Sequence, residues 1–263
     1  MECSLITPIQ WIVSDDSLAA AIEWASKKLN YSIDRPNMNA RDISEALDDK
    51  IMGDIATIAV AEFIRSRGYQ AVAYDQIRND SFQEPDPGWD LAIGIKGLNE
   101  WARSTSSPKL PPKEKCLTVS VRSSRLVRDE PISEAISQRD FKIFALNPKN
   151  IGTDLTADIE TQVYYPLANS QLNGRSINHE NVVACCSDRS NCNEILSKLD
   201  IRNRYGECTL TAWDYSNRIH HYSQSIRTKT WSSFGKKMWI APLRNGMSFE
   251  SIFQELSKFG NKI

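Results

Sequence analysis

Apolar residues recur every three or four positions along residues 43–67, the strongest periodic pattern in the chain. Such a stripe lies along one face of a helix. Its members are Ile43, Leu47, Ile51, Ile55, Ile58 and Ile64. Arg65 and Arg67 fall in the last turn, where they suit the helix dipole, and Gly68 is a natural stop. The pattern therefore predicts a long helix, with Gly53 as a point at which it could divide in two.

Weaker patterns predict the remaining elements. Helices are expected from the capping run 14–17 to Leu29, over 132–138, and from Ser248 to Phe259. Before residue 150, strands are expected at 69–74, 89–95, 117–122 and 141–146. After it, strands are expected at 163–165, 181–185, 208–213 and 237–241. The proline-rich stretch 97–115 is expected to be a long mobile connection.

Two of these strands alternate in a way that matters for chemistry. In the strand 89–95 the apolar residues share one face and Asp90 points to the other. In the strand 117–122 the apolar residues again share a face, and Ser120 and Arg122 take the opposite one. The pattern thus predicts two neighbouring polar strand faces.

Composition narrows the class without giving a function. The 263 residues include 32 Lys and Arg against 33 Asp and Glu, so the formal net charge is −1. This balance argues against a basic nucleic-acid coat, an acidic tail or a disordered chain, but a local basic face remains compatible with it. No apolar stretch approaches a membrane span, and the first residues lack the basic lead of a secretory signal.

The six cysteines point to a reducing compartment. A chain of this length can bury a sufficient core without disulfides, so reduced thiols and a cytoplasmic location are expected. Four cysteines and three histidines between residues 179 and 221 raise the alternative of a zinc site. No CxxC or HxxxH spacing is present, which favours ordinary thiols.

The order helix, strand, Asp-bearing strand, polar-faced strand, helix, strand over residues 43–147 resembles the core of the PD-(D/E)XK nuclease superfamily. The matching segments are 53–56 to 67–69, 85–91 and 119–124. The resemblance implies an α/β fold with a restriction-endonuclease-like central mixed sheet flanked by helices, and an α+β C-terminal extension. It divides the chain into an N-terminal helical segment (1–42), the core (43–150) and an extension for DNA recognition or dimerisation (151–263). One continuous domain is the alternative.

In that family, acids on two neighbouring strands hold a divalent metal, and a lysine two residues after the second acid acts on the attacking water. The resemblance implies Mg²⁺ or Mn²⁺ bound by Asp90, with Asp54 or Glu62 as the helix acid. It places Ser120 and Arg122 where the family carries Glu and Lys. The alternative for each charged residue is a solvated surface position.

The second strand is where the chain departs from the family. Serine supplies no carboxylate, and arginine stays protonated and so cannot act as a base. Arg122 can still contact a phosphate with its planar fork. Glu114 and Asp86 are the nearby candidates for the missing acid. The site is therefore either rearranged or inactive.

The resemblance implies DNA as the partner and hydrolysis of its phosphodiester bonds as the activity, in restriction or phage defence. The candidate nucleic-acid contacts are Arg122, Arg125, Arg128, Lys236 and Lys237. The alternative function is a catalytically degenerate nuclease fold that binds DNA or acts as a scaffold in a larger complex; a protein-interaction domain is a third. Both a homodimer and a subunit of a multi-protein complex are compatible with the sequence, and no membrane partner is expected.

Overall fold

The computed structural model describes residues 6–29, 31, 43–127, 130–145, 154–166, 200–222, 228–231 and 236–260. Its strands are β1 Ile9–Ile12, β2 Gln70–Ala73, β3 Leu91–Gly94, β4 Cys116–Arg125, β5 Ile159–Tyr165, β6 Glu207–Tyr215, β7 Thr228–Trp231 and β8 Lys236–Trp239. Its α-helices are α1 Asp15–Leu29, α2 Ile43–Ser66, α3 Tyr74–Ile77, α4 Leu98–Ser104, α5 Ile132–Gln138, α8 Ile201–Tyr205, α9 Ser216–Tyr222 and α10 Ile252–Leu256. Short 3₁₀ turns cover 243–245, 249–251 and 257–259.

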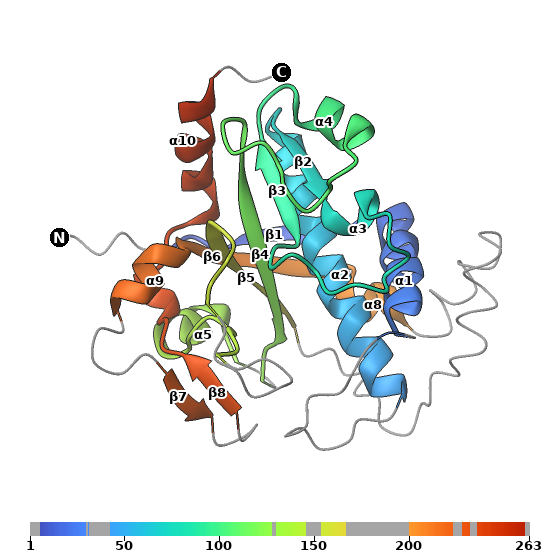
Figure 1. Cartoon of the computed structure of the whole chain (residues 1–263). Coiled ribbons are helices and arrows are strands. Elements are labelled where there is room, and N and C mark those ends of the chain that lie inside the picture. Colours follow the sequence, from blue (N-terminus) through green and yellow to red (C-terminus); the bar gives the residue numbers. More distant parts are fainter. Residues whose placement is uncertain are drawn as a thin grey trace.

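The fold is α/β, built on a mixed six-stranded sheet with the order β1-β6-β5-β4-β3-β2 and helices on both sides (Figure 1). β2, β3 and β4 follow one another as antiparallel neighbours. The chain then crosses over through α5 and returns as β5, parallel to β4. β6 and β1 extend the sheet in antiparallel pairing, so strands from all three predicted segments share one sheet. A separate β7-β8 ribbon lies beside α5 and α9 (Figure 1).

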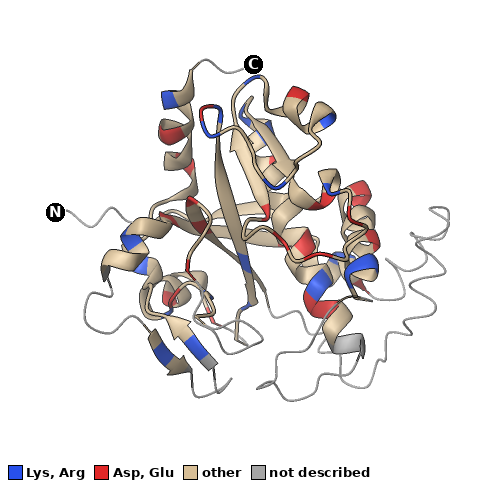
Figure 2. Cartoon of the chain, in the orientation of Figure 1, with Lys and Arg blue, Asp and Glu red and all other residues tan. Residues whose placement is uncertain are grey.

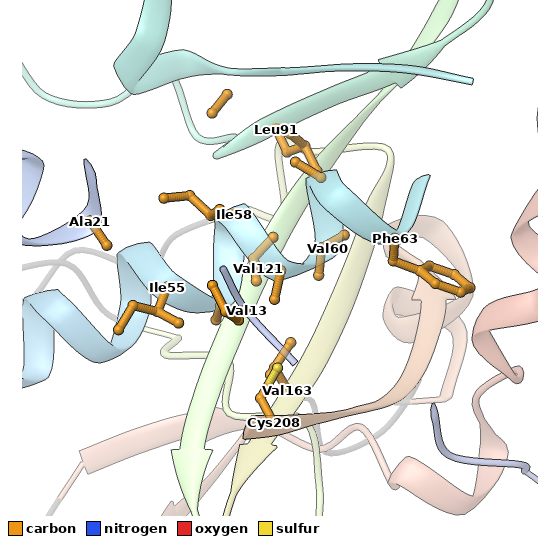
Figure 3. Close-up of a cluster of buried hydrophobic side chains, with 14 of the residues drawn as sticks. Val13, Ala21, Ile55, Ile58, Val60, Phe63, Leu91, Val121, Val163 and Cys208 are labelled. Carbon is orange, nitrogen blue, oxygen red and sulfur yellow. The ribbon is translucent and has the colours of Figure 1, made fainter. Parts of the chain in front are cut away.

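Helix α2 is enclosed between α1 and the sheet. Leu47, Ile51 and Ile55 are fully buried, and Ala59 and Phe63 are buried as well. Figure 3 shows Ile55 and Ile58 of α2 between Ala21 of α1 and the strand residue Val121. Full burial of each large aliphatic side chain contributes about 1.5–3 kcal/mol. The packing carries α2 straight through Gly53, so the expected division of this helix is not found.

The two faces of the sheet are covered differently. The face toward α2, called the α2 face below, carries one large apolar cluster that includes Leu91, Val119 and Val121. The opposite face carries two smaller clusters. One surrounds Phe141 and Trp239 beside α5 and β8, and the other surrounds Trp89, Ala92 and Leu98 beside α4. Ser120 and Arg122 of β4 and Glu160 of β5 lie on this opposite face, which therefore holds the candidate site.

The predicted strand at 141–146 is wrong in detail. Asp140 and Phe144 form only isolated bridges, to Pro242 and Met238. Phe141, Ile143 and Ala145 are buried by pairing loosely with the 237–242 segment instead of joining the main sheet. The strand parallel to β4 is β5, which begins after the predicted core ends at residue 150.

The 97–115 connection contains helix α4, because Leu98 packs into the cluster around Trp89. The final helix is split by 3₁₀ turns on either side of α10. The predicted strand at 181–185 lies outside the described residues. No helix in the described ranges is both long enough and apolar enough to cross a membrane.

Candidate functional site

Asp90 lies immediately before β3, and both its backbone and its carboxylate form hydrogen bonds to neighbouring residues. Its carbonyl accepts from the Tyr74 N–H at 2.9 Å, and its own N–H donates to Val119 O at 2.9 Å. Its Oδ2 accepts from the Val121 N–H at 2.7 Å and from the Ser120 hydroxyl at 3.3 Å. The carboxylate is thus fixed over β4. Among the described residues, Oδ1 has no hydrogen-bond partner.

The turn before Asp90 depends on Gly88. Its φ of +91° is a left-handed conformation that favours glycine, and its carbonyl accepts from Thr156 Oγ1 at 3.1 Å. A Cβ at this position would lie 1.9 Å from that same hydroxyl oxygen. Next along the chain, the Trp89 ring packs edge-on against Tyr74, with centroids 5.3 Å apart. This local packing sets where Asp90 enters the sheet.

Four polar residues form a row across the face opposite α2. The register pairs Leu91 with Val119, which places Asp90 opposite Ser120. Ser120 pairs with Glu160 of β5, and Glu160 pairs with Asp214 of β6. We call Asp90, Ser120, Glu160 and Asp214 the polar row. It runs between the two apolar clusters of this face.

Arg122 lies two residues after Ser120 and therefore on the same face. Its Nε donates to Glu160 Oε2 at 2.9 Å. The Glu160 side chain is only 1% exposed, whereas that of Arg122 is 30% exposed. Burial raises the pKa of Glu160, and Arg122 limits the rise. Burial opposes the charge on Arg122, but Glu160 and Asp90 together raise the pKa of its guanidinium.

A second charged group lies between α1, α2 and α3. Lys28 forms ion pairs with both Asp54 and Asp75. Asp54 is buried, and its Oδ2 has no hydrogen-bond partner in the part of the chain that the structure describes. Burial raises the pKa of Asp54 to about 7, and the attraction of Lys28 acts against that rise. The helix acid is therefore already committed to a lysine.

Arg78 links this group to the loop before Asp90. It forms ion pairs with Asp75 at 3.1 Å, Asp80 at 2.7 Å and Asp86 at 2.9 Å. Burial raises the pKa of Asp86, and nearby Asp75 and Asp90 add to the rise. Acidic segments are visible in the loop that enters β3, whereas lysines mark β7 and β8 (Figure 2).

The other acids suggested by the sequence lie apart from Asp90. Glu62 accepts from Trp11 Nε1 at 2.9 Å and from the Ser17 hydroxyl, at the junction of β1 and α1. Glu114 is exposed in the turn before β4, two residues ahead of the start of that strand. Only Asp90, Ser120 and Arg122 come together as expected.

The predicted nucleic-acid contacts are dispersed. Arg125 points to the α2 face, opposite to Arg122, and its guanidinium pairs with Asp48 and Asp49. Lys237 is exposed on β8. Arg128 and the side chain of Lys236 lie outside the described parts of the structure.

The donor chemistry of the polar row fits a small divalent cation. Asp90 and Glu160 supply hard carboxylate oxygens on either side of Ser120. Within the described ranges, no three His, Cys, Asp or Glu side chains are grouped closely enough to hold a metal by themselves. Mg²⁺ commonly takes one or two carboxylates and fills its remaining positions with water and substrate phosphate. A pair is therefore a sufficient donor set.

Glu160 is the one member of this site, besides Asp214, that is not among the residues expected from the sequence. Residues 159–165 alternate, with Ile159, Thr161 and Val163 on one face and Glu160 and Gln162 on the other. This alternation marks Glu160 as a polar strand residue, but the core is expected to end near residue 150, before this strand.

Comparison of the chain with models of known families, with curated proteins and with solved structures yields no match.

Proposed function

We propose that this protein is a metal-dependent endonuclease-like protein that hydrolyses phosphodiester bonds of DNA. The observation that carries the proposal is the convergence of Asp90, Ser120 and Arg122 on one face of β3 and β4. The elements α2, β2, β3, β4 and α5 also follow one another as the resemblance to PD-(D/E)XK nucleases requires, with the short helices α3 and α4 between them. The last strand of that order is β5, in place of the strand expected at 141–146. A restriction-endonuclease-like core is part of the same proposal.

Asp90 is the residue that would hold Mg²⁺ or Mn²⁺. Its Oδ2 is occupied by the Val121 N–H and the Ser120 hydroxyl, which orient the carboxylate and leave Oδ1 available. When bound, the metal would polarise the phosphodiester and lower the pKa of a water molecule. Asp54 would assist from α2 only after exchanging Lys28 for the metal.

Arg122 would contact the phosphate. Its side chain is 30% exposed and its Nε donates to Glu160, and no hydrogen bond within the described residues occupies its two terminal nitrogens. A planar fork with parallel donors suits two phosphate oxygens at once. Because arginine stays protonated, its contribution is charge and position.

A second function has its own supporting observation. Position 120 is serine, and the nearest buried acid is already paired with Arg122. A catalytically degenerate nuclease fold that binds DNA, or acts as a scaffold in a larger complex, would retain this arrangement. DNA binding that is unchanged in chelator and falls steeply with salt would favour this second function. A cytoplasmic place in restriction or phage defence, as a homodimer or a subunit of a complex, belongs to the proposal through the resemblance alone.

Plasmid cleavage tests the first function directly. Supercoiled DNA is incubated with the full chain in Mg²⁺ or Mn²⁺, beside Asp90→Ala and the control Glu62→Gln, whose acid lies at the β1–α1 junction. We expect nicking by the wild type and by the control, loss in chelator, and a decrease of more than about tenfold in Asp90→Ala. Equal nicking by wild type and Asp90→Ala, or an inert wild type on every DNA form, contradicts the proposal.

A further inference from the structure

We propose that Glu160 is the second metal-ligating carboxylate of this site and takes the role that Ser120 cannot fill. This inference rests on the proposed function and adds a residue from β5, a strand outside the segment on which the resemblance is based. It means that the polar row is a rearranged site.

The register places Glu160 on the correct side of the sheet. Ser120 pairs with Asp90 on one side and with Glu160 on the other, so both acids flank the same small residue. Neighbouring strands lie about 4.8 Å apart, so the two backbones are separated by about 10 Å. Side chains of aspartate and glutamate that lean over a serine can bring their carboxylates to a single cation.

The burial of Glu160 carries a free-energy cost, because a carboxylate is removed from water. Its side chain is almost completely buried on a sheet face where it has one cationic partner, Arg122. Buried ion pairs are usually no more stabilising than apolar residues of the same volume. Stability alone therefore gives little reason for an acid at this position, whereas a metal site requires one.

The partner of Glu160 suggests how the site would be completed. Arg122 and Glu160 neutralise each other in the absence of substrate. A phosphate that takes the guanidinium of Arg122 would release the carboxylate to the metal. Metal and DNA should therefore increase each other's affinity, because such coupling is reciprocal.

Calorimetric titration of the full chain with Mn²⁺ tests the inference without relying on cleavage. The variants are Glu160→Gln, the double variant Ser120→Glu/Glu160→Gln, and the control Asp140→Asn. Asp140 is a buried acid paired with Lys229 beside the β7-β8 ribbon, so its loss matches Glu160→Gln in kind. Thermal melting followed by circular dichroism verifies that each variant is folded.

The expected result is a loss of Mn²⁺ affinity of at least about tenfold in Glu160→Gln, recovery in the double variant, and no change in the control. Wild-type affinity in a folded Glu160→Gln, or a wild type that binds no Mn²⁺, overturns the inference. If Glu160→Gln fails to fold, Arg122→Gln/Glu160→Gln removes both members of the ion pair and takes its place, with the same expected loss. If metal binding depends on Glu160 but the protein cleaves no DNA, the proposed activity is overturned, whereas the role of Glu160 as a metal ligand stands.

Arg122→Gln provides a second readout. The variant frees Glu160 from its guanidinium, so Mn²⁺ affinity without DNA should equal or exceed that of the wild type. The same titration is then done with Ca²⁺ in place of Mn²⁺, in the presence and absence of a short DNA duplex. The duplex should increase the Ca²⁺ affinity of the wild type and have little effect on that of the variant. A large loss of metal affinity in folded Arg122→Gln contradicts the inference, because it would make the arginine necessary for the metal.

Discussion

The α2 face and the opposite face of the sheet both hold buried acids, but they surround them differently. On the α2 face, Asp48 Oδ2 accepts from Arg125, Arg204 and Tyr205, while the buried Oδ1 has no hydrogen-bond partner among the described residues. On the opposite face, Glu160 has one cationic partner, the partly exposed Arg122, and the Ser120 hydroxyl as a second polar neighbour. The first arrangement ties α8 and β4 to α2, whereas the second leaves donor atoms and charge available to a ligand.

A cluster of charged residues is therefore a poor guide to function unless the partners of each residue are known. Arg125 was a candidate for nucleic-acid binding by its place in the sequence, yet its guanidinium is directed to Asp48 and Asp49. Arg122, only three residues away, points to the other face and keeps part of its surface in solvent. The two arginines separate because side chains alternate along a strand.

Asp48→Asn should give the largest effect on stability. The change leaves Arg204, which is almost fully buried, without its carboxylate and weakens the hold on Arg125. Removing one partner of a buried pair costs about 3–5 kcal/mol. Urea denaturation should show this loss, whereas Mn²⁺ affinity of the folded variant should remain that of the wild type.

Asp49→Asn is the matched control for that prediction. Asp49 is the next residue of α2 and reaches Arg125 at 3.4 Å from a half-exposed position. Exposed pairs contribute about 0–1 kcal/mol, so the stability should change little. If the two variants are equally unstable, the buried pair is not what distinguishes the α2 face.

Gly88→Ala should affect both stability and the site on the opposite face. The positive φ and the approach of Thr156 leave no room for a Cβ, and the strain should cost about 1–3 kcal/mol. Since Gly88 precedes Asp90 by two residues, Mn²⁺ affinity should fall as well. The double variant Gly88→Ala/Thr156→Ala relieves the clash but retains the φ strain, so it should recover only part of the stability. Full recovery would show that the backbone conformation at Gly88 is unimportant.

Asp54→Asn should change the pH dependence of stability. Burial raises the pKa of Asp54 to about 7 in the folded state, against about 3.9 in an unfolded chain. The folded state thus binds this proton more tightly, and that contribution to stability is lost as the pH rises from about 4 to about 7. The asparagine variant has no titrating group at this position and so does not lose this contribution. The unfolding free energy of the variant minus that of the wild type should therefore rise between about pH 4 and about pH 7 and stay constant above about pH 8. A value that falls as the pH rises contradicts the prediction.

The sequence predicted the elements whose pattern is local and missed those that depend on distant partners. Helix α5 was placed correctly, and β3 and β4 were located through their alternation. The 141–146 segment has the same alternation but pairs with residues near 240, which no local pattern reveals. Asp90, Ser120 and Arg122 followed from two adjacent strands. Glu160 depends on a crossover of more than 30 residues between β4 and β5, and only the register identifies it.

Ser120→Ala should have the smallest effect and is the sharpest comparison of the two faces. The change removes the 3.3 Å hydrogen bond to Asp90, but the shorter bond from the Val121 N–H remains. A single hydrogen bond of this kind contributes about 0.5–1.5 kcal/mol, and Mn²⁺ affinity should stay within about threefold of wild type. Thr161→Val is the control on the α2 face, where a fully buried hydroxyl donates to Ser120 O at 3.2 Å. Its loss should lower stability by a similar amount and leave metal binding unchanged. A loss of metal affinity above about tenfold in Ser120→Ala would mean that the serine oxygen itself acts at the metal, and Glu160 would then be a structural partner of Arg122 alone.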